Sequence, residues 1–256
     1  MKILAIGDII GKPGRRAVKE LLPALKLGLG IDFVIANGEN AAGGKGLTPE
    51  TAEELFSCGV DVITSGNHIW AQQEIYPMLE GSAPVLRPLN YPPGVPGKGF
   101  VTVKGVMVVS LMGRTFINTI DCPFRAMDAL LSSLDRKPGH IIVDFHAEAT
   151  SEKQAMGWHL DGKVSAVVGT HTHVGTVDAR VLPGGTACVS DIGMVGPWHS
   201  IIGDDKDEVL SRFLTGLHQR LSVAKGARIT FNSVLITTDS NGRAIAIERV
   251  DREAAI

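Results

Sequence analysis

The 256-residue sequence contains few cysteines and few aromatic residues. Its three cysteines, Cys58, Cys122 and Cys188, are widely spaced and odd in number. This pattern does not fit a disulfide framework, and it predicts reduced core thiols. Aromatic residues make up only 5% of the chain, and they are not interleaved with clusters of Lys and Arg. The sequence therefore argues against an extended nucleic-acid-binding surface.

A dominant charge and long hydrophobic runs are also missing. The formal net charge is -2, and Asp8 ends the first apolar run too early for a secretory signal peptide. No run reaches the roughly 18 apolar residues that a membrane-spanning helix requires. We therefore expect a cytoplasmic protein that does not engage a membrane, and a homo-oligomer is compatible with these features.

No repeat, low-complexity tract or polar linker divides the chain. Hydrophobic residues make up 44% of it, which is enough to bury a large core, and its length lies at the upper end for one domain. We predict a single domain over residues 1–256, with a frayed tail from Asp251 to Ile256.

The periodicity of apolar residues predicts strands that alternate with helices in the first half. Pro23 is expected to kink or divide the first helix, and Ser151 with Gln154 has the spacing of a capping box at the start of the last one. Two packed mixed sheets with outer helices follow from this pattern. The predicted helices cover residues 14–29, 49–57, 121–134 and 151–160, and the predicted hairpins pair 100–103 with 106–111 and 228–238 with 243–250.

Polar residues follow several short apolar runs, at the points where strands are expected to end. The carboxyl ends of strands are where an open α/β sheet builds a ligand site. We therefore predict that these residues converge on one site. In chain order they are Asp8, Glu39, Asn40, Asn67, His68, His146, His171 and His173.

The donor atoms of this set indicate a metal centre. Carboxylate, carboxamide and imidazole groups suit manganese, iron or zinc. Alternate residues of a strand share a face, so His171 and His173 are expected to point the same way toward two neighbouring ions. A carboxylate can bridge ions about 3.5 to 4 Å apart, and Glu39, central in the order, is the candidate bridge.

Other interpretations of the same residues remain open. A lone His146 on an apolar strand would more often be a core or surface histidine, and only its place in the ordered set favours ligation. Asn67 could cap the segment that follows it, and Asn40 could turn the chain before Gly43. A phosphate-binding loop at residues 7–12 is rejected, because its spacing is one residue short and a proline follows the lysine.

Five ordered motifs give the chain a family resemblance. Gly7-Asp8, Asn37-Gly38-Glu39-Asn40, Gly66-Asn67-His68, His146 and Gly169-x-His171-x-His173 resemble the signature of calcineurin-like metallophosphoesterases. Ile10 stands where that family has its first histidine, and Glu39 stands where it has the bridging aspartate. Both departures are similar to the YmdB-like branch, in which an asparagine beside the bridging glutamate replaces the missing histidine.

The resemblance implies a four-layer α/β/β/α fold and a dinuclear centre. Asp8, Glu39, Asn40 and His173 would hold one ion, and Glu39, Asn67, His146 and His171 would hold the other. His68 would protonate the leaving oxygen. The implied cofactors are two divalent or mixed-valence transition-metal ions, iron or manganese.

The activity implied by the resemblance is hydrolysis of cyclic nucleotides, notably 2',3'-cyclic phosphates, so the expected partner is a small phosphodiester. The expected mechanism is in-line attack by a hydroxide that bridges the metals. A nucleophilic serine is not expected, because no Gly-x-Ser-x-Gly elbow is present. There are two alternatives. One is another dinuclear phosphohydrolase, either a phosphomonoesterase or a nuclease, and the other is a metal-stabilised regulatory protein with low turnover.

Two further residues are candidates for supporting roles. Trp198 could form the rim of the substrate pocket, and Glu148 could orient a metal ligand.

Overall fold

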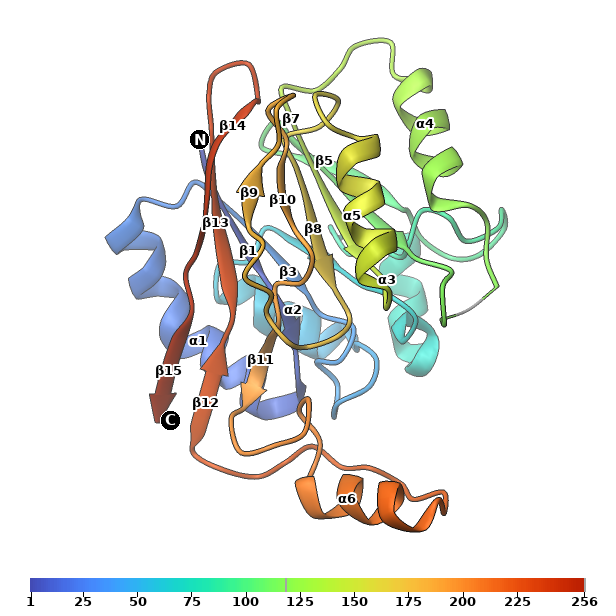
Figure 1. Ribbon diagram of the computed structural model, residues 1–256, viewed down its shortest axis with the longest axis vertical. Coiled ribbons are helices and arrows are strands. Elements are labelled where there is room, and N and C mark those ends of the chain that lie inside the picture. The colour runs from blue at the N-terminus through green and yellow to red at the C-terminus, as the bar shows by residue number, and fades with distance from the viewer. Residues whose placement is uncertain (118, 256) are drawn as a thin grey trace.

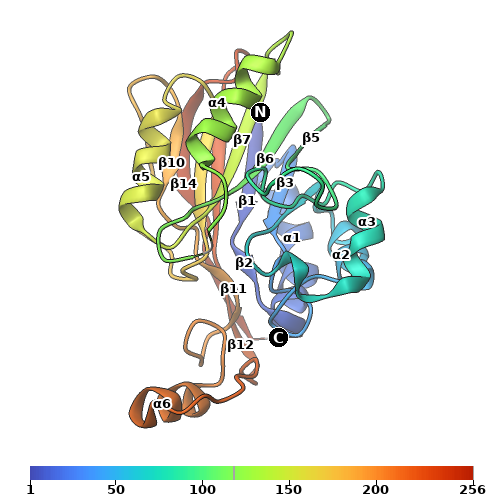
Figure 2. The same cartoon turned by 90° about the vertical axis from the view of Figure 1, so that its right-hand side faces the viewer.

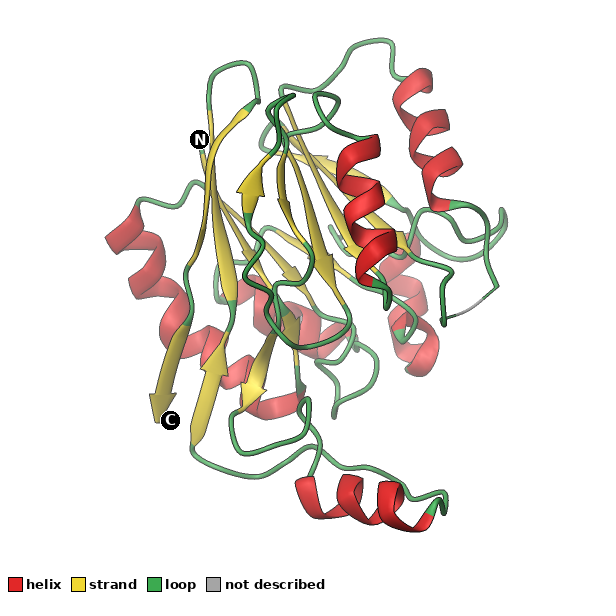
Figure 3. Cartoon of the chain, in the orientation of Figure 1, coloured by secondary structure: helices red, strands yellow, loops and turns green. Residues whose placement is uncertain are grey.

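The computed structural model describes residues 1–117 and 119–255. Two large mixed sheets pack face to face, and helices cover both outer faces (Figure 1). In the view of Figure 2, α1, α2 and α3 lie on one side of the strands and α4 and α5 on the other. Colouring by secondary structure shows the helices outside and the strands between them (Figure 3). The predicted four-layer α/β/β/α arrangement is confirmed.

The first sheet has five strands in the order β14-β13-β1-β3-β4. β1, β3 and β4 run parallel, and β13 is antiparallel to both β1 and β14. Its strands are β1 (Lys2–Ile6), β3 (Phe33–Asn37), β4 (Val62–Thr64), β13 (Ser233–Thr238) and β14 (Ala244–Arg249). The helices of this half are α1 (Gly11–Leu29), α2 (Pro49–Ser57) and α3 (Tyr76–Glu80), with short 3-10 turns η1 (Ile69–Ala71) and η2 (Gln73–Ile75).

The second sheet has six strands in the order β5-β6-β7-β8-β10-β9. Its four central strands, β6, β7, β8 and β10, run parallel. The edge strands β5 and β9 are antiparallel to their neighbours. Its strands are β5 (Phe100–Val103), β6 (Val106–Met112), β7 (His140–His146), β8 (Ala166–Thr170), β9 (Arg180–Val181) and β10 (Ala187–Val189). The helices of this half are α4 (Pro123–Ser133) and α5 (Thr150–His159).

A third, four-stranded sheet in the order β15-β12-β11-β2 continues the first. Only Gly7 separates β1 from β2, and only Asn232 separates β12 from β13. In Figure 1, α6 (Lys206–Thr215) lies at the lower end of the molecule, beyond this sheet. The strands of the third sheet are β2 (Asp8–Ile9), β11 (Met194–Pro197), β12 (Arg228–Phe231) and β15 (Arg252–Ala255).

Alternation along the strands explains the layers. In β6, Val106 and Val108 point into the core between the two large sheets, whereas Met107 and Val109 pack under α4 and α5. All seven residues of β6 are buried. Complete burial of one such apolar side chain contributes about 1.5 to 3 kcal/mol to the stability of the fold. A strand with two apolar faces therefore stabilises both the core between the sheets and the core under the helices.

Three local predictions were wrong. Division of the first helix at Pro23 is wrong, because α1 runs unbroken through this residue; Pro23 is exposed, so water can solvate the carbonyl that the proline leaves without a donor. Ser151 is not a cap, because α5 begins at Thr150 after Ala149 and its first turn has no side-chain cap. The predicted strand over residues 228–238 breaks at Asn232 and serves two sheets.

The predicted frayed tail was also wrong, because β15 pairs with β12 over four residues; Ile256 lies outside the described residues. The three cysteines are free, as predicted, but all three are only half-buried, and of them Cys58 and Cys188 pack against the cores. Within residues 1–117 and 119–255, no helix has both the length and the apolar character that crossing a bilayer requires.

Candidate metal centre

All eight predicted site residues come together at the carboxyl ends of strands in the two large sheets. Glu39 and Asn40 follow β3, and Asn67 and His68 follow β4. On the second sheet, His146 ends β7, and His171 and His173 follow β8. Asp8 opens β2, directly after β1. The edge of the sandwich predicted from the sequence is therefore the edge at which these side chains meet.

His146 is fully enclosed, with an exposed fraction of 0%. Its ring lies directly on the backbone of Gly66, where a Cβ atom would come within 2.1 Å of His146 Cδ2. Gly66 is therefore the residue that lets this imidazole enter between the two sheets.

The two nitrogens of His146 have different surroundings. Nδ1 lies 3.0 Å from the Thr170 hydroxyl, which itself donates to the Asp144 carboxylate at 2.7 Å. A hydroxyl has a single hydrogen, so the Thr170 oxygen accepts from Nδ1–H. In the neutral imidazole, Nε2 then carries only a lone pair.

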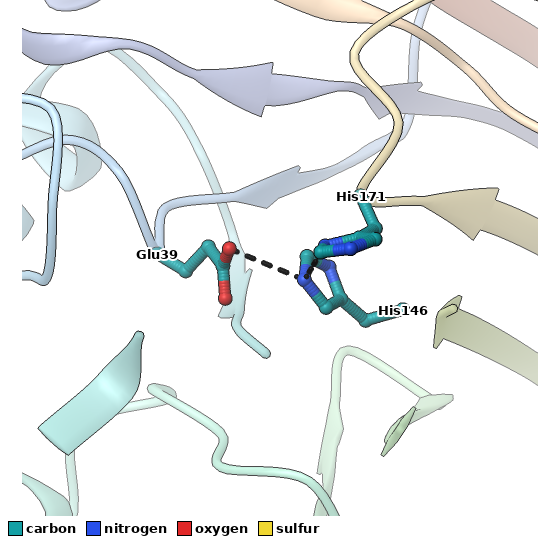
Figure 4. A group of neighbouring side chains, drawn as sticks. All are labelled: Glu39, His146 and His171. Atoms are coloured by element: carbon teal, nitrogen blue, oxygen red, sulfur yellow. Dashed lines mark hydrogen bonds and ion pairs between the residues drawn. The ribbon is translucent and has the colours of Figure 1, made fainter. Parts of the chain in front are cut away.

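That lone pair faces other acceptors. His146 Nε2 lies 3.0 Å from Asn67 Oδ1, 3.2 Å from Glu39 Oε1 and 3.0 Å from His171 Nδ1. Figure 4 shows Glu39, His146 and His171 converging, and their ligand atoms all lie within 4.8 Å of one another. Separations of this size are those of neighbouring ligands on one cation, so the second predicted ligand set fits a metal ion.

The first predicted ligand set is less closed. Asp8 is 0% exposed, and its Oδ1 is buried without a hydrogen-bond partner, 3.7 Å from His173 Nε2. An orphaned buried carboxylate oxygen is costly unless a cation satisfies it. Asn40 lies beside it, with Nδ2 3.3 Å from His173 Nε2. In this orientation the amide nitrogen faces His173, and Oδ1, the atom that binds metals, faces His68.

The ionisation of the cluster depends on its own members. Burial opposes ionisation of Glu39, but His146 holds the pKa of this carboxyl well below its ordinary value. Burial likewise opposes charge on His173, yet the Asp8 carboxylate raises the pKa of His173 to about 9. Burial and the neighbouring His146 lower the pKa of His171 to about 4. Glu39 and Asp8 are thus ionised at neutral pH and His171 is neutral, whereas the carboxylates raise the pKa of His146 and of His173, so a metal ion would displace a proton from each of these two rings.

The backbone at the two last histidines is strained. The φ angles are +102° at His171 and +64° at His173, a region that costs residues other than glycine about 1 to 3 kcal/mol. The expectation that both share a strand face was wrong, because β8 ends at Thr170. The left-handed turn brings His171 to His146 and His173 to Asp8.

A buried ion pair that the sequence analysis missed holds this turn. Asp191 Oδ2 accepts from the backbone N–H and the hydroxyl of Thr172, at 3.1 and 2.7 Å. Lys153 Nζ donates to the same oxygen at 2.6 Å, and the two charged side chains are 3% and 2% exposed. Asp191 therefore fixes the residue between the two histidines, and Lys153 neutralises it.

Lys153→Met should destabilise the protein by about 3 to 5 kcal/mol, because it leaves the Asp191 charge buried and unpaired. Denaturant unfolding measures the effect. Lys206→Met removes an equally short pair with Asp207 whose side chains are 58% and 76% exposed, and it should cost less than about 1 kcal/mol. Equal losses in the two variants would show that burial adds nothing to the importance of the Lys153 pair.

Two further carboxyl groups, those of Asp144 and Glu148, contact the predicted ligands or the residues that hold them. Asp144 accepts from Asn37, Thr64 and Thr170, and burial raises the pKa of Asp144 to about 6; the sequence analysis missed it because it looks like one more residue of a buried strand. Glu148 Oε2 lies 3.0 Å from His171 Nε2. This matches the orienting contact predicted for Glu148, which leaves Nδ1 of His171 for the centre.

His68 lies beside the ligands and reaches the solvent-facing side. Its Nδ1 lies 2.7 Å from Asn40 Oδ1, and its backbone N–H donates to Glu39 Oε2 at 3.1 Å. Its side chain is 30% exposed. Nε2 is the ring nitrogen left without a partner in the described part of the chain, so it is available to a bound molecule.

A cleft of about 290 Å³ opens over the centre. Trp198 does not line it; the indole instead packs against Arg228, 4.1 Å from the ring, and donates to Glu253. A larger cavity of about 540 Å³ lies at the amino-terminal ends of β7 and β8, away from these groups. The residues lining the cleft are Ile10, Glu39, Gly44, His68, Glu148, His171, Thr172, His173, Ile202 and Asp204.

Comparison with known proteins agrees with this geometry. The sequence model of the YmdB-like protein family matches residues 4–250, nearly the whole chain. The chain belongs to the YmdB-like family. The predicted family is therefore confirmed, and membership of this metallophosphoesterase family implies divalent metal ions.

Relatives of this YmdB-like chain are similar over their whole length. The 2',3'-cyclic-nucleotide 2'-phosphodiesterase of Bacillus subtilis (strain 168) is 46% identical over 254 residues, which cover 98% of this chain and 96% of that protein. A hypothetical protein from Thermus thermophilus has a crystal structure with a TM-score of 0.93 and 48% identity, covering 99% of this chain and 100% of that one. A phosphatase from Mycoplasma pneumoniae gives a TM-score of 0.93 at 33% identity, covering 100% and 94%. These names bear out the expected enzyme class, a phosphoric ester hydrolase.

Proposed function

We propose that this YmdB-like chain is a dinuclear metal-dependent phosphodiesterase that hydrolyses cyclic nucleotides, with 2',3'-cyclic phosphates as preferred substrates. The observation that carries the proposal is the convergence of Asn67 Oδ1, Glu39 Oε1 and His171 Nδ1 on His146 Nε2, four atoms of the kinds that ligate metal ions. The activity named for the Bacillus subtilis relative supports the choice of substrate.

The ligand sets proposed for the two ions share Glu39. Its Oε1 lies 3.2 Å from His146 Nε2 and 3.3 Å from Asn40 Nδ2, so this one oxygen faces members of both sets. When bound, the ions would supply a Lewis acid that activates water and neutralises phosphate charge. We propose iron or manganese, the metals that the family resemblance implies, and the oxygen and nitrogen donors of the two sets suit both.

His68 is proposed to donate the proton that the leaving oxygen takes up. A histidine that gives up a proton and ends as a neutral ring must start as the imidazolium, with protons on both Nδ1 and Nε2. Asn40 Oδ1, 2.7 Å from His68 Nδ1, would accept the Nδ1 proton, and the Nε2 proton would go to the leaving oxygen. A carbonyl oxygen has two lone pairs, so Asn40 Oδ1 would remain open to an ion as well.

The decisive experiment uses protein reconstituted with iron or manganese. We expect two ions per chain by elemental analysis, and we expect faster hydrolysis of 2',3'-cyclic nucleotides than of 3',5'-cyclic nucleotides, linear diesters and monoesters. Saturation at one ion would contradict the dinuclear centre. It would indicate that the first metal site is lost because Ile10 replaces the histidine of the wider family. A preference for monoesters would replace the proposed activity by that of a phosphomonoesterase. Metal-loaded protein that hydrolyses none of these substrates would instead be a metal-stabilised regulatory protein.

A further inference from the structure

The walls of the cleft are acidic. Among the described residues that line it, none is Lys or Arg, whereas Glu148 and Asp204 both border it. Ile10 and Ile202 also line the cleft and give it apolar surface. Attraction for a phosphate must therefore come from the metal centre and from His68, because the two carboxylates that border the cleft repel an anion.

Asp204 is presented to the cleft by a tight turn. Ile201 and Asp204 exchange two backbone hydrogen bonds, each 3.0 Å long, around Ile202 and Gly203. The φ angles of these two central residues are +50° and +105°, which is strained for a β-branched isoleucine. The carbonyl of Ile202 accepts from His173 Nδ1 at 2.7 Å, so the turn is fastened to a predicted metal ligand.

The carboxylate of Asp204 is not used by the fold. Its backbone pairs with Ile201 and Val223, but its side chain has no hydrogen-bond or ion-pair partner in residues 1–117 and 119–255. The side chain is half-buried, and burial raises its pKa, although His173 and His68 oppose that shift. A carboxylate without a partner in such a cleft is free to attract or repel the charge of a molecule that binds there.

We propose that Asp204 makes the cleft selective for the net charge of the phosphate, admitting a singly negative diester and disfavouring a doubly negative monoester. This inference rests on the proposed function. Water forms a new P–O bond, one ester P–O bond breaks, and a proton goes to the leaving oxygen. The resulting monoester has a second pKa near 6, so at neutral pH and above it carries more negative charge than the substrate.

The same charge assists release of the product. The reaction itself generates the additional negative charge beside Asp204, so repulsion rises only after the ester bond has broken. A substrate with one charge is excluded less than its product, and the cleft therefore discriminates between two molecules of nearly the same shape. Apolar Ile10 and Ile202 suit the uncharged remainder of a nucleoside.

Asp204→Asn tests this, since it removes the charge and keeps the shape. Binding of adenosine 3'-monophosphate to the metal-loaded protein is measured by calorimetry, and KM and kcat are measured with 2',3'-cyclic AMP. From the Coulomb interaction across a partly solvated cleft, the variant should bind the monophosphate about tenfold tighter and change KM by about threefold or less. Raising the salt concentration should narrow the difference between variant and parent.

Two matched variants serve as controls. Asp204→Glu keeps the charge and should keep the discrimination of the parent. Asp207→Asn removes an exposed charge on α6 outside the cleft and should change neither measurement. An unchanged ratio of product to substrate binding in Asp204→Asn would overturn the proposal, and so would weaker substrate binding, which would make Asp204 a hydrogen-bond acceptor for substrate. Failure of the parent protein to hydrolyse any diester would instead remove the proposed function, and inorganic phosphate would then serve as the anion probe.

Discussion

His68→Ala is expected to keep its metal ions and to lose about 10² to 10⁴ in turnover, which is the usual contribution of a positioned general acid. The substrate affinity should change little, because Nε2 of His68 holds no part of the protein together. An alkoxide leaves poorly without a proton, whereas a nitrophenolate does not need one. The loss should therefore shrink on a nitrophenyl phosphodiester, which steady-state kinetics on both substrates would show.

Asn67→Ala is the matched comparison for His68→Ala, because Asn67 is the neighbouring residue and its Oδ1 faces His146 Nε2 at 3.0 Å. This variant should lose metal and turnover together, as elemental analysis and kinetics would show. If His68→Ala loses the same factor on natural and activated substrates while both ions remain bound, His68 is not the acid and positions the phosphate instead.

Glu39→Ala should abolish the thermal response of the protein to metal. Ions that bind only the folded state stabilise it by about 4 kcal/mol at a thousandfold excess over the dissociation constant, and for a chain of this size 1 kcal/mol moves the melting temperature by about 2 to 4 °C. Chelation should therefore lower the melting temperature of the parent by roughly 10 °C. In Glu39→Ala, calorimetry with and without chelator should give the same curve.

Glu53→Ala is the control for Glu39→Ala, because it removes an exposed glutamate on α2, which carries none of the predicted ligands. It should respond to chelation as the parent does. A metal-free parent that melts at the temperature of the metal-loaded form would show that the cluster around Glu39 is not a metal site.

The positions of the candidate ligands could be predicted from the sequence because the signal is local. Each polar residue follows an apolar run, and parallel strands bring such points to one edge of the sheet. The convergence of His171 and His146 was expected on those grounds. The left-handed backbone at His171 and His173 could not be predicted, because their residue types do not favour it and Asp191, a residue from another segment, stabilises it.

The supporting groups were missed for a related reason. Asp144 looks in sequence like one more residue of a buried strand, and Lys153 looks like a solvated helix position. Only the pairing of distant segments shows that both carry buried charge. Asp204 had no sequence signal, because its role depends on a turn whose central residue is an isoleucine. The fold class followed from alternation of strands and helices, whereas β15 and the break at Asn232 depend on which strands pair across the chain.

The pairing of β1 with β13 and of β2 with β11 sets the order in which the protein can be completed during its synthesis. The Asp8 backbone N–H donates to Gly193 O at 3.0 Å, and β1 is flanked by β3 and by a strand from the last tenth of the chain. At about 5 to 20 residues per second, Asp8 leaves the ribosome roughly 10 to 40 seconds before Gly193. For most of that interval the nascent chain presents Asp8, Glu39 and Asn40 without the last histidines, so this centre can close only after most of the chain has been synthesised.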